Sequence, residues 1–188
     1  LQNASGVSVV AVSSKKTDGP AGLRVLDVVD PARPYEIGAY DTPGYAYDVA
    51  IVGEWAYVAD GSKGLRIIEV SDPAPPVEIG SFDTLGKAHG VCVVEGQAYV
   101  ADGPEGLRLI RISGAGGPVE DGFCDTPGYA LDVAMAGTHA YVADYWGGLR
   151  IIRLPQRQPW IRTRAGRTGG VARVGLSGGG DLAPQRED

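Results

Sequence analysis

The chain has 188 residues, of which 44% are apolar, as expected for a globular domain with a substantial core. Its formal net charge of −6 argues against binding to a nucleic-acid backbone, and no apolar run approaches the roughly 18 residues needed to span a membrane. We therefore expect no nucleic-acid partner and no membrane insertion. The 29 glycines and 13 prolines indicate many short strands joined by tight turns.

The chain begins with a weak copy of a unit that recurs more clearly later. Residues 22–40 resemble residues 64–82, and the apolar run VSVVAV precedes them. Lys15 and Lys16, however, stand where a later copy has Tyr57 and the valine after it. Because paired lysines are costly at core positions, we predict a degenerate first copy with an exposed edge strand.

The unit is clearest in three copies that start 42 residues apart, at Asp41, Asp83 and Asp125. Each copy predicts four short strands, which in the first of them are YAYDVAIV, WAYVAD, LRIIEV and VEIGSF. No segment has the apolar spacing of a helix. Four antiparallel strands in about 42 residues are typical of a β-propeller blade.

The third strand of the unit is apolar on both faces, with Leu65 and Ile67 on one face and Ile68 on the other. A sheet packed between two neighbouring sheets needs two apolar faces. The sequence therefore predicts an all-β fold, an incomplete β-propeller of about four four-stranded antiparallel blades with a 42-residue repeat. The predicted division is a degenerate first blade (1–40), two blades (41–82 and 83–124), a blade with a weak last strand (125–163) and a degenerate or disordered tail (164–188).

The segments YVADGSKGLRIIEV, YVADGPEGLRLIRI and YVADYWGGLRIIRL resemble the LVIVD repeat. This family comprises β-propeller-like repeats of bacterial and archaeal secreted or cell-surface proteins. The resemblance covers residues 7–154 and implies an extracellular or cell-surface location. It implies no catalytic residue, because the motif is structural.

Three or four repeats are fewer than the number of blades that usually close a ring. We therefore expect an open arc, whose two end faces would be apolar and uncovered. The missing blades are expected first in a longer native gene and second in an associating copy. Tight closure as four blades is least expected, because the unchanged 42-residue phase shows no sign of altered packing. Self-association through the uncovered faces is thus one expected interaction.

An aspartate recurs before the second loop of each copy, at Asp18, Asp60, Asp102 and Asp144, and an arginine follows each one six residues later. These pairs could form a ring of acid–base groups. We interpret them as structural, because a catalytic group rarely repeats in every blade. The aspartate is expected to cap its own turn, and the arginine to pair with a carboxylate of a neighbouring blade.

Asp48 and Asp132 fall on the inner strand that would line a central channel. They are weak candidates for a cation site, since the equivalent position between them is Gly90 and two carboxylates alone bind metal poorly. The chain has no recognisable metal-binding, nucleotide-binding or nucleophile motif. We expect no metal and no cofactor.

Positions at which the copies differ are better candidates for function. His89 replaces Tyr47, and Tyr145 and Trp146 replace small residues of the second loop. Together with Tyr129 these side chains would rim one face of the propeller. Such an aromatic surface suits stacking on a protein or glycan partner.

We therefore expect a non-catalytic interaction module of a secreted or cell-surface protein, which binds a macromolecular partner through its loop face. One alternative is an enzyme of glycosidase or lyase type with a channel site built from Asp48, Asp132 and His89. Another is a purely structural repeat spacer.

Overall fold

The computed structural model describes residues 7–13, 22–72, 75–112 and 117–154. These residues form strands joined by loops, with one short 3₁₀ helix, η1 (Tyr145–Gly147). No helix among them is long and apolar enough to cross a membrane.

The strands make four antiparallel sheets, in which neighbours in the chain are neighbours in the sheet. We call the sheets blades 1 to 4. Blade 1 contains β1 (Val7–Ser13), β2 (Gly22–Asp27) and β3 (Tyr35–Asp41), and blade 2 contains β4 (Asp48–Val52), β5 (Trp55–Ala59), β6 (Leu65–Glu69) and β7 (Val77–Phe82). Blade 3 contains β8 (Gly90–Val94), β9 (Gln97–Ala101), β10 (Leu107–Arg111) and β11 (Val119–Cys124), and blade 4 contains β12 (Asp132–Ala136), β13 (His139–Ala143) and β14 (Leu149–Arg153).

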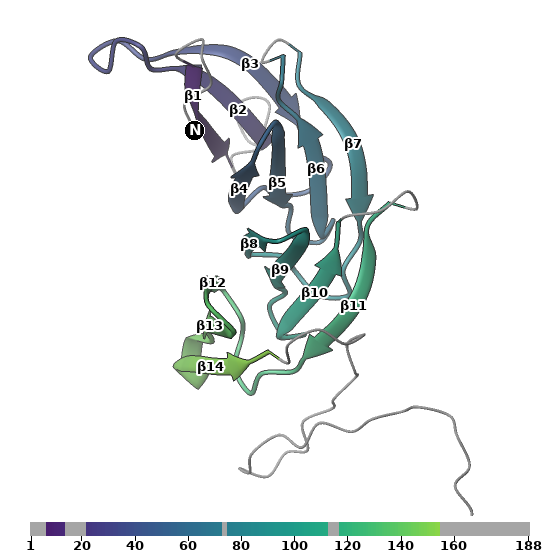
Figure 1. Ribbon diagram of the computed structural model, residues 1–188. Coiled ribbons are helices and arrows are strands. Elements are labelled where there is room, and N and C mark those ends of the chain that lie inside the picture. Colours follow the sequence, from purple (N-terminus) through teal and green to yellow (C-terminus); the bar gives the residue numbers. More distant parts are fainter. Residues whose placement is uncertain (1–6, 14–21, 73–74, 113–116, 155–188) are drawn as a thin grey trace, which may run out of the picture.

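The blades follow one another along an open arc (Figure 1). The first strands β4, β8 and β12 lie on its concave side, and the last strands β7 and β11 lie on its convex side. Blades 1 and 4 stand at opposite ends. The predicted all-β, incomplete propeller is thereby confirmed.

Blade 1 is assembled differently from the prediction. Strand β1 pairs directly with β2, so that Val10 lies opposite Val25 just as Tyr57 lies opposite Ile67 in blade 2. The apolar run therefore takes the place of the second strand, not the first. In this register Val10 and Val12 are the residues of β1 opposite Val25 and Leu23 of β2. The lysine pair at 15–16, the last strand expected for blade 4 and the tail after residue 154 lie outside the described residues.

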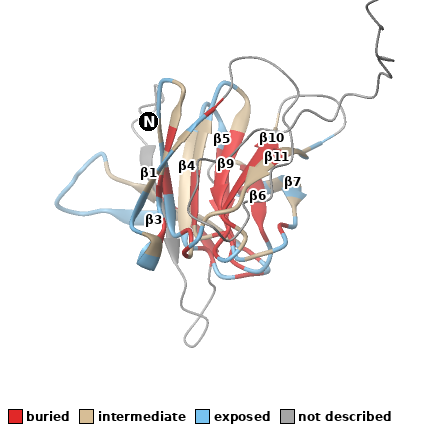
Figure 2. Cartoon of the chain, turned by 90° about the horizontal axis from the view of Figure 1, so that it is seen from below, coloured by how far each residue is buried: buried red, intermediate tan, exposed pale blue. Residues whose placement is uncertain are grey.

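Neighbouring blades pack through the same two faces each time. We call face A the side of a blade toward the next blade, and face B the side toward the preceding one. Between blades 2 and 3, Tyr57, Leu65 and Ile67 of face A form one buried cluster with Val100 and Ile110 of face B. Equivalent clusters join blades 3 and 4 and blades 1 and 2. Burial is accordingly concentrated in the middle strands β5, β6, β9 and β10 (Figure 2), which confirms two buried faces for the third strand in blades 2 and 3.

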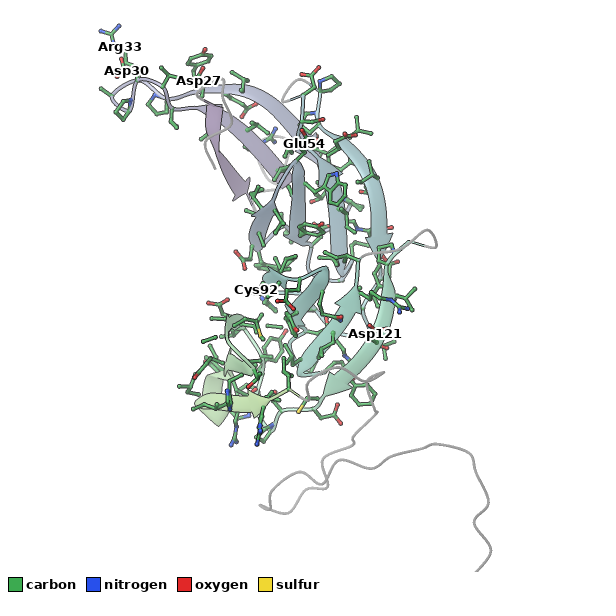
Figure 3. The ribbon with its side chains drawn as sticks, in the orientation of Figure 1. Asp27, Asp30, Arg33, Glu54, Cys92 and Asp121 are labelled. Carbon is green, nitrogen blue, oxygen red and sulfur yellow. The ribbon has the colours of Figure 1, made fainter. Side chains whose placement is uncertain are left out.

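The two cysteines lie on opposite edge strands of blade 3 and are free thiols. Cys92 is on the inner strand β8, whereas Cys124 is on the outer strand β11, the strand that carries Asp121 in Figure 3. Three strand spacings of about 4.8 Å separate these edges, too far for a disulfide. Both thiols are half-buried, and burial raises the pKa of each.

A buried aspartate joins the two loops at one end of each complete repeat. In blade 2 its Oδ1 atom accepts a hydrogen bond from the Thr42 hydroxyl at 2.6 Å, and its Oδ2 atom accepts one from the Gly44 N–H at 2.7 Å. Blades 3 and 4 repeat both bonds. The aspartates are Asp60, Asp102 and Asp144, and their donors are Thr42 and Gly44, Thr84 and Gly86, and Thr126 and Gly128.

This bonding supports a structural role for the recurring aspartates but corrects the predicted partner. The carboxylate of Asp60 holds a loop that lies 16 to 18 residues earlier in the chain, not its own turn. We call this contact the aspartate clasp. Gly44 has to be glycine, because a Cβ atom there would collide with the carbonyl oxygen of Asp60.

The recurring arginine adds ion pairs to this arrangement, which in blade 2 reach the next connection of the chain and in blade 3 join Arg108 to Glu105 and Glu120 of its own blade. Arg66 is nearly buried, and its Nη2 atom lies 2.6 Å from the carboxylate of Asp83, on the connection to blade 3. Its Nη1 atom lies 3.6 Å from Glu78. Its Nε atom is 3.8 Å from Asp60, so this contact is an ion pair without a hydrogen bond.

We expect the substitution Asp60→Ala to lower the free energy of unfolding by about 3 kcal/mol. It removes two charge-assisted hydrogen bonds and one of the three carboxylates that surround the nearly buried Arg66. Urea denaturation followed by circular dichroism measures this loss. The matched substitution Asp83→Ala affects a largely exposed carboxylate and should cost less than about 1 kcal/mol. Equal stability of the Asp60→Ala variant and the wild type would contradict the clasp.

Candidate functional site

The candidate aromatic residues come from two sets of loops at the same end of the blades. The leading loops (42–47, 84–89 and 126–131) run into the inner strands, and the second loops (60–64, 102–106 and 144–148) precede the third strands. The aspartate clasp fixes each leading loop to the second loop of its own blade. Side chains on these loops are therefore held in a defined arrangement.

The structure brings all five candidate residues into one continuous row. The ring of Tyr47 lies 4.4 Å from that of His89, and His89 lies 5.4 Å from Tyr129. Tyr129 is 6.2 Å from Trp146, whose ring is 5.1 Å from that of Tyr145. We call these five side chains the aromatic row; it crosses from blade 2 through blade 3 to blade 4.

Backbone bridges between blades hold the row in register. Gly61 and Ala88 exchange two hydrogen bonds of 3.0 Å, and Gly103 and Ala130 do the same at 3.1 and 2.9 Å. A Cβ atom at Gly103 would lie 2.8 Å from the ring of Tyr129. Glycine is therefore required where the second loop of one blade passes over the leading loop of the next.

Tyr145 occupies the position that Gly61 and Gly103 fill in the earlier blades. Its backbone has φ +43°, a left-handed conformation that costs a non-glycine residue about 1 kcal/mol. Tyr145 and Trp146 are both 68% exposed. The indole N–H of Trp146 donates to the carbonyl oxygen of Pro127 at 3.3 Å, which turns its ring toward Tyr129.

His89 is the one titratable imidazole within the row. Its Nε2 atom lies 3.2 Å from the hydroxyl of Tyr129, a hydrogen bond whose direction depends on the tautomer. Burial, with a smaller contribution from the positive charge of Lys87, lowers the pKa of His89 below its ordinary value of 6.5. The neutral imidazole is therefore favoured at neutral pH.

Asp48 and Asp132 lie at the starts of the inner strands β4 and β12, as predicted. The carboxylate of Asp48 bridges two blades, since it accepts the N–H of Val49 at 2.8 Å and that of Val91 in blade 3 at 2.9 Å. The carboxylate of Asp132 accepts the N–H of Val133 at 2.8 Å. Among the described residues, no group of three or more His, Cys, Asp or Glu side chains is placed to hold a metal ion.

An apolar crevice lies at the opposite end of blades 2 and 3, away from the aromatic row. It is lined by Val52, Trp55, Tyr57, Val93 and Ile112 around the turn at Gly53 and Glu54. Its lining is mainly apolar. Figure 3 shows Glu54 on the far side of blade 2 from the loops described above.

The sequence did not reveal the glycine–alanine bridges or the contact between His89 and Tyr129. Both contacts join different blades, and their partners have no fixed spacing pattern beyond the repeat itself. The one available signal was that Gly61 and Gly103 are replaced by Tyr145 in the last copy.

The LVIVD repeat family matches residues 17–42, 43–84, 85–126 and 127–152. The computationally designed Ika4 protein has a similar fold, with a TM-score of 0.55 and 10% sequence identity over 81% of this chain and 88% of that one. A structure of S. cerevisiae Dbp5 bound to Nup159, Gle1, IP6 and ADP matches 72% of this chain and 38% of its own, at 10% identity and a TM-score of 0.44. No curated protein matches the sequence.

We expect acidification to weaken the fold around the aromatic row. Because the pKa of folded His89 lies below 6.5, the unfolded chain binds the proton first as the pH falls. The contribution of His89 to stability is therefore complete above about pH 6.5 and is lost as the pH falls through the folded pKa. Titration of the imidazole by NMR should give an apparent pKa below 6.5, and the variant His89→Gln should lack this part of the pH dependence. A pKa of 6.5 or higher would show that the ring is not buried in the row.

Proposed function

The chain belongs to the LVIVD repeat family, and from that premise we propose that it is a non-catalytic β-propeller module that binds a macromolecular partner through the aromatic row. The proposed setting is a secreted or cell-surface protein of a bacterium or archaeon, in keeping with the proteins in which such repeats occur.

The observation that carries the proposal is the unbroken contact of five aromatic rings across three blades. Tyr47 is half-exposed, and Tyr145 and Trp146 are more exposed still. Exposed tryptophan and tyrosine supply large contact areas at little cost in side-chain entropy, and they dominate many binding surfaces. An extended row fits an extended partner better than a small molecule, which would need a concave site.

The backbone of Tyr145 strengthens this argument. Glycine would adopt its left-handed conformation without strain, and glycine stands at the equivalent positions 61 and 103. A strained, exposed aromatic residue at this point gains nothing from core packing. Such an outlier is expected where a side chain serves binding.

Two of the three side chains that a channel enzyme would need, Asp48 and His89, are engaged in contacts between blades. Both oxygens of Asp48 accept backbone N–H groups, so this carboxylate joins blades 2 and 3. His89 lies against Tyr47 and Tyr129 within the row. Acid–base catalysis needs a proton donor and acceptor directed at substrate, and these contacts support a binding role over the channel-enzyme alternative.

A partner would be a glycan or a protein surface, since both stack on indole and phenol rings. We expect the substitution Trp146→Ala to weaken binding by at least about tenfold, because it removes the larger of the two most exposed rings of the row. Sedimentation with insoluble peptidoglycan, chitin and cellulose measures glycan binding. Immobilised cell-envelope proteins test a protein partner with the same variant.

The matched control is Trp55→Ala, which removes an indole from the crevice at the other end of the blades. It should leave binding unchanged. Loss of binding in the Trp55→Ala variant together with full binding by the Trp146→Ala variant would move the site to the crevice and refute the proposed surface.

A further inference from the structure

The last blade of the arc exposes a face that the other blades bury. On face A of blade 4, Leu149 and Ile151 are 64% and 60% exposed. Their equivalents in blades 2 and 3 are at most 6% exposed: Leu65, Ile67, Leu107 and Leu109. Two adjacent large aliphatic side chains on an open sheet face mark an interaction surface.

What covers this face elsewhere in the molecule is known, because the same contact occurs three times. Each face A in blades 1 to 3 packs on face B of another LVIVD blade. The hydrogen bonds of the aspartate at the start of the inner strand also differ between a covered and an uncovered blade. Asp48 accepts an N–H group from the next blade through Oδ2, whereas Oδ2 of Asp132 accepts no hydrogen bond among the described residues.

A matching face B is available at the other end of the arc. Faces B of blades 2, 3 and 4 are covered by the preceding blades. In blade 1, Leu26 stands at the position of Ile68, which packs toward the preceding blade, and Leu26 is only half-buried. The chain thus carries an exposed face A at one end of the arc (Figure 1) and, at the other end, a face B whose Leu26 is only half-buried.

We propose that two copies of this chain close a ring of eight blades, in which face A of blade 4 in each copy packs on face B of blade 1 in the other. The two ends are different surfaces, so a head-to-tail contact repeated by a two-fold axis satisfies both at once. Eight blades lie within the range of four to eight that propellers typically use, whereas three copies would give twelve. Closure within one copy would require the two ends of the arc to meet.

Analytical ultracentrifugation of the full chain tests the ring. We expect a mass twice that of one 19.6 kDa chain, with a population that becomes monomeric on dilution. The substitution Leu149→Glu places a charge on face A and should raise the dissociation constant by at least about tenfold. The same substitution at Leu85, an exposed loop residue that is 81% accessible, should leave it unchanged.

The substitution Leu26→Glu on face B of blade 1 distinguishes the ring from other dimers. It should weaken the dimer as Leu149→Glu does, because the ring uses both faces. A dimer broken by Leu149→Glu but not by Leu26→Glu would pair two faces A and would overturn the proposal. A wild-type chain that stays monomeric would also overturn the proposal and would mean that another part of the chain covers blade 4. A mass that keeps growing with concentration would overturn it too, because it would indicate an open filament.

Far-UV circular dichroism of each variant verifies that the strands are retained. Since Leu149 is exposed, a folded monomer is the expected product. If Leu149→Glu did not fold, Ile151→Thr, a milder change on the same face, replaces it in the same measurement. Unchanged dimerisation of that folded variant would count against the ring.

Discussion

A sheet with two apolar faces is stable only between two others, and the whole molecule follows from this constraint. Each complete repeat encodes a third strand whose side chains are apolar on both sides, as in β6 and β10. The blades must then stack in sequence, and the order of the chain sets the order of the arc. Because the inner strands converge, the loops at one end of neighbouring blades approach one another. The aromatic row is a product of this stacking, since its contacts cross two blade boundaries.

The aspartate clasp connects the buried part of each blade to its exposed loops. A carboxylate away from solvent requires strong partners, and Asp60 obtains them from the Thr42 hydroxyl, the Gly44 amide and the charge of Arg66. The leading loop is thus held by charge-assisted bonds although it has no regular secondary structure. Tyr47 lies three residues after Gly44, so these bonds also restrict its position. Preorganised aromatic side chains lose little entropy on binding, which is an advantage for a recognition surface.

Periodicity predicted the fold well, because a 42-residue repeat places every strand, turn and two-faced segment in the same register. The residues of the aromatic row could also be predicted, since Tyr145 and Trp146 break the repeat at a turn where the other copies have small residues. The aspartate clasp could not be predicted, because an aspartate before glycine also fits a local turn and the donors to Asp60 are 16 to 18 residues away. The register of β1 escaped prediction for another reason. Aligning the copies by spacing alone ignores that the first strand can move along its partner to bring apolar residues opposite it.

The ion pairs of Arg24 and Arg66 and the aspartate clasp have a consequence for how the gene could gain or lose repeats. Arg24 and Arg66 contact Asp41 and Asp83, the first residue of the following copy. The clasp, by contrast, is completed within one copy. Duplication or deletion of a 42-residue unit therefore breaks no clasp. Arg24 or Arg66 would still meet an aspartate at the start of the copy that follows it, whereas Arg108 pairs with Glu105 and Glu120 of its own copy. An exchange with any other length would separate donors from acceptors, so recombination should preserve this unit and leave the loops free to diverge.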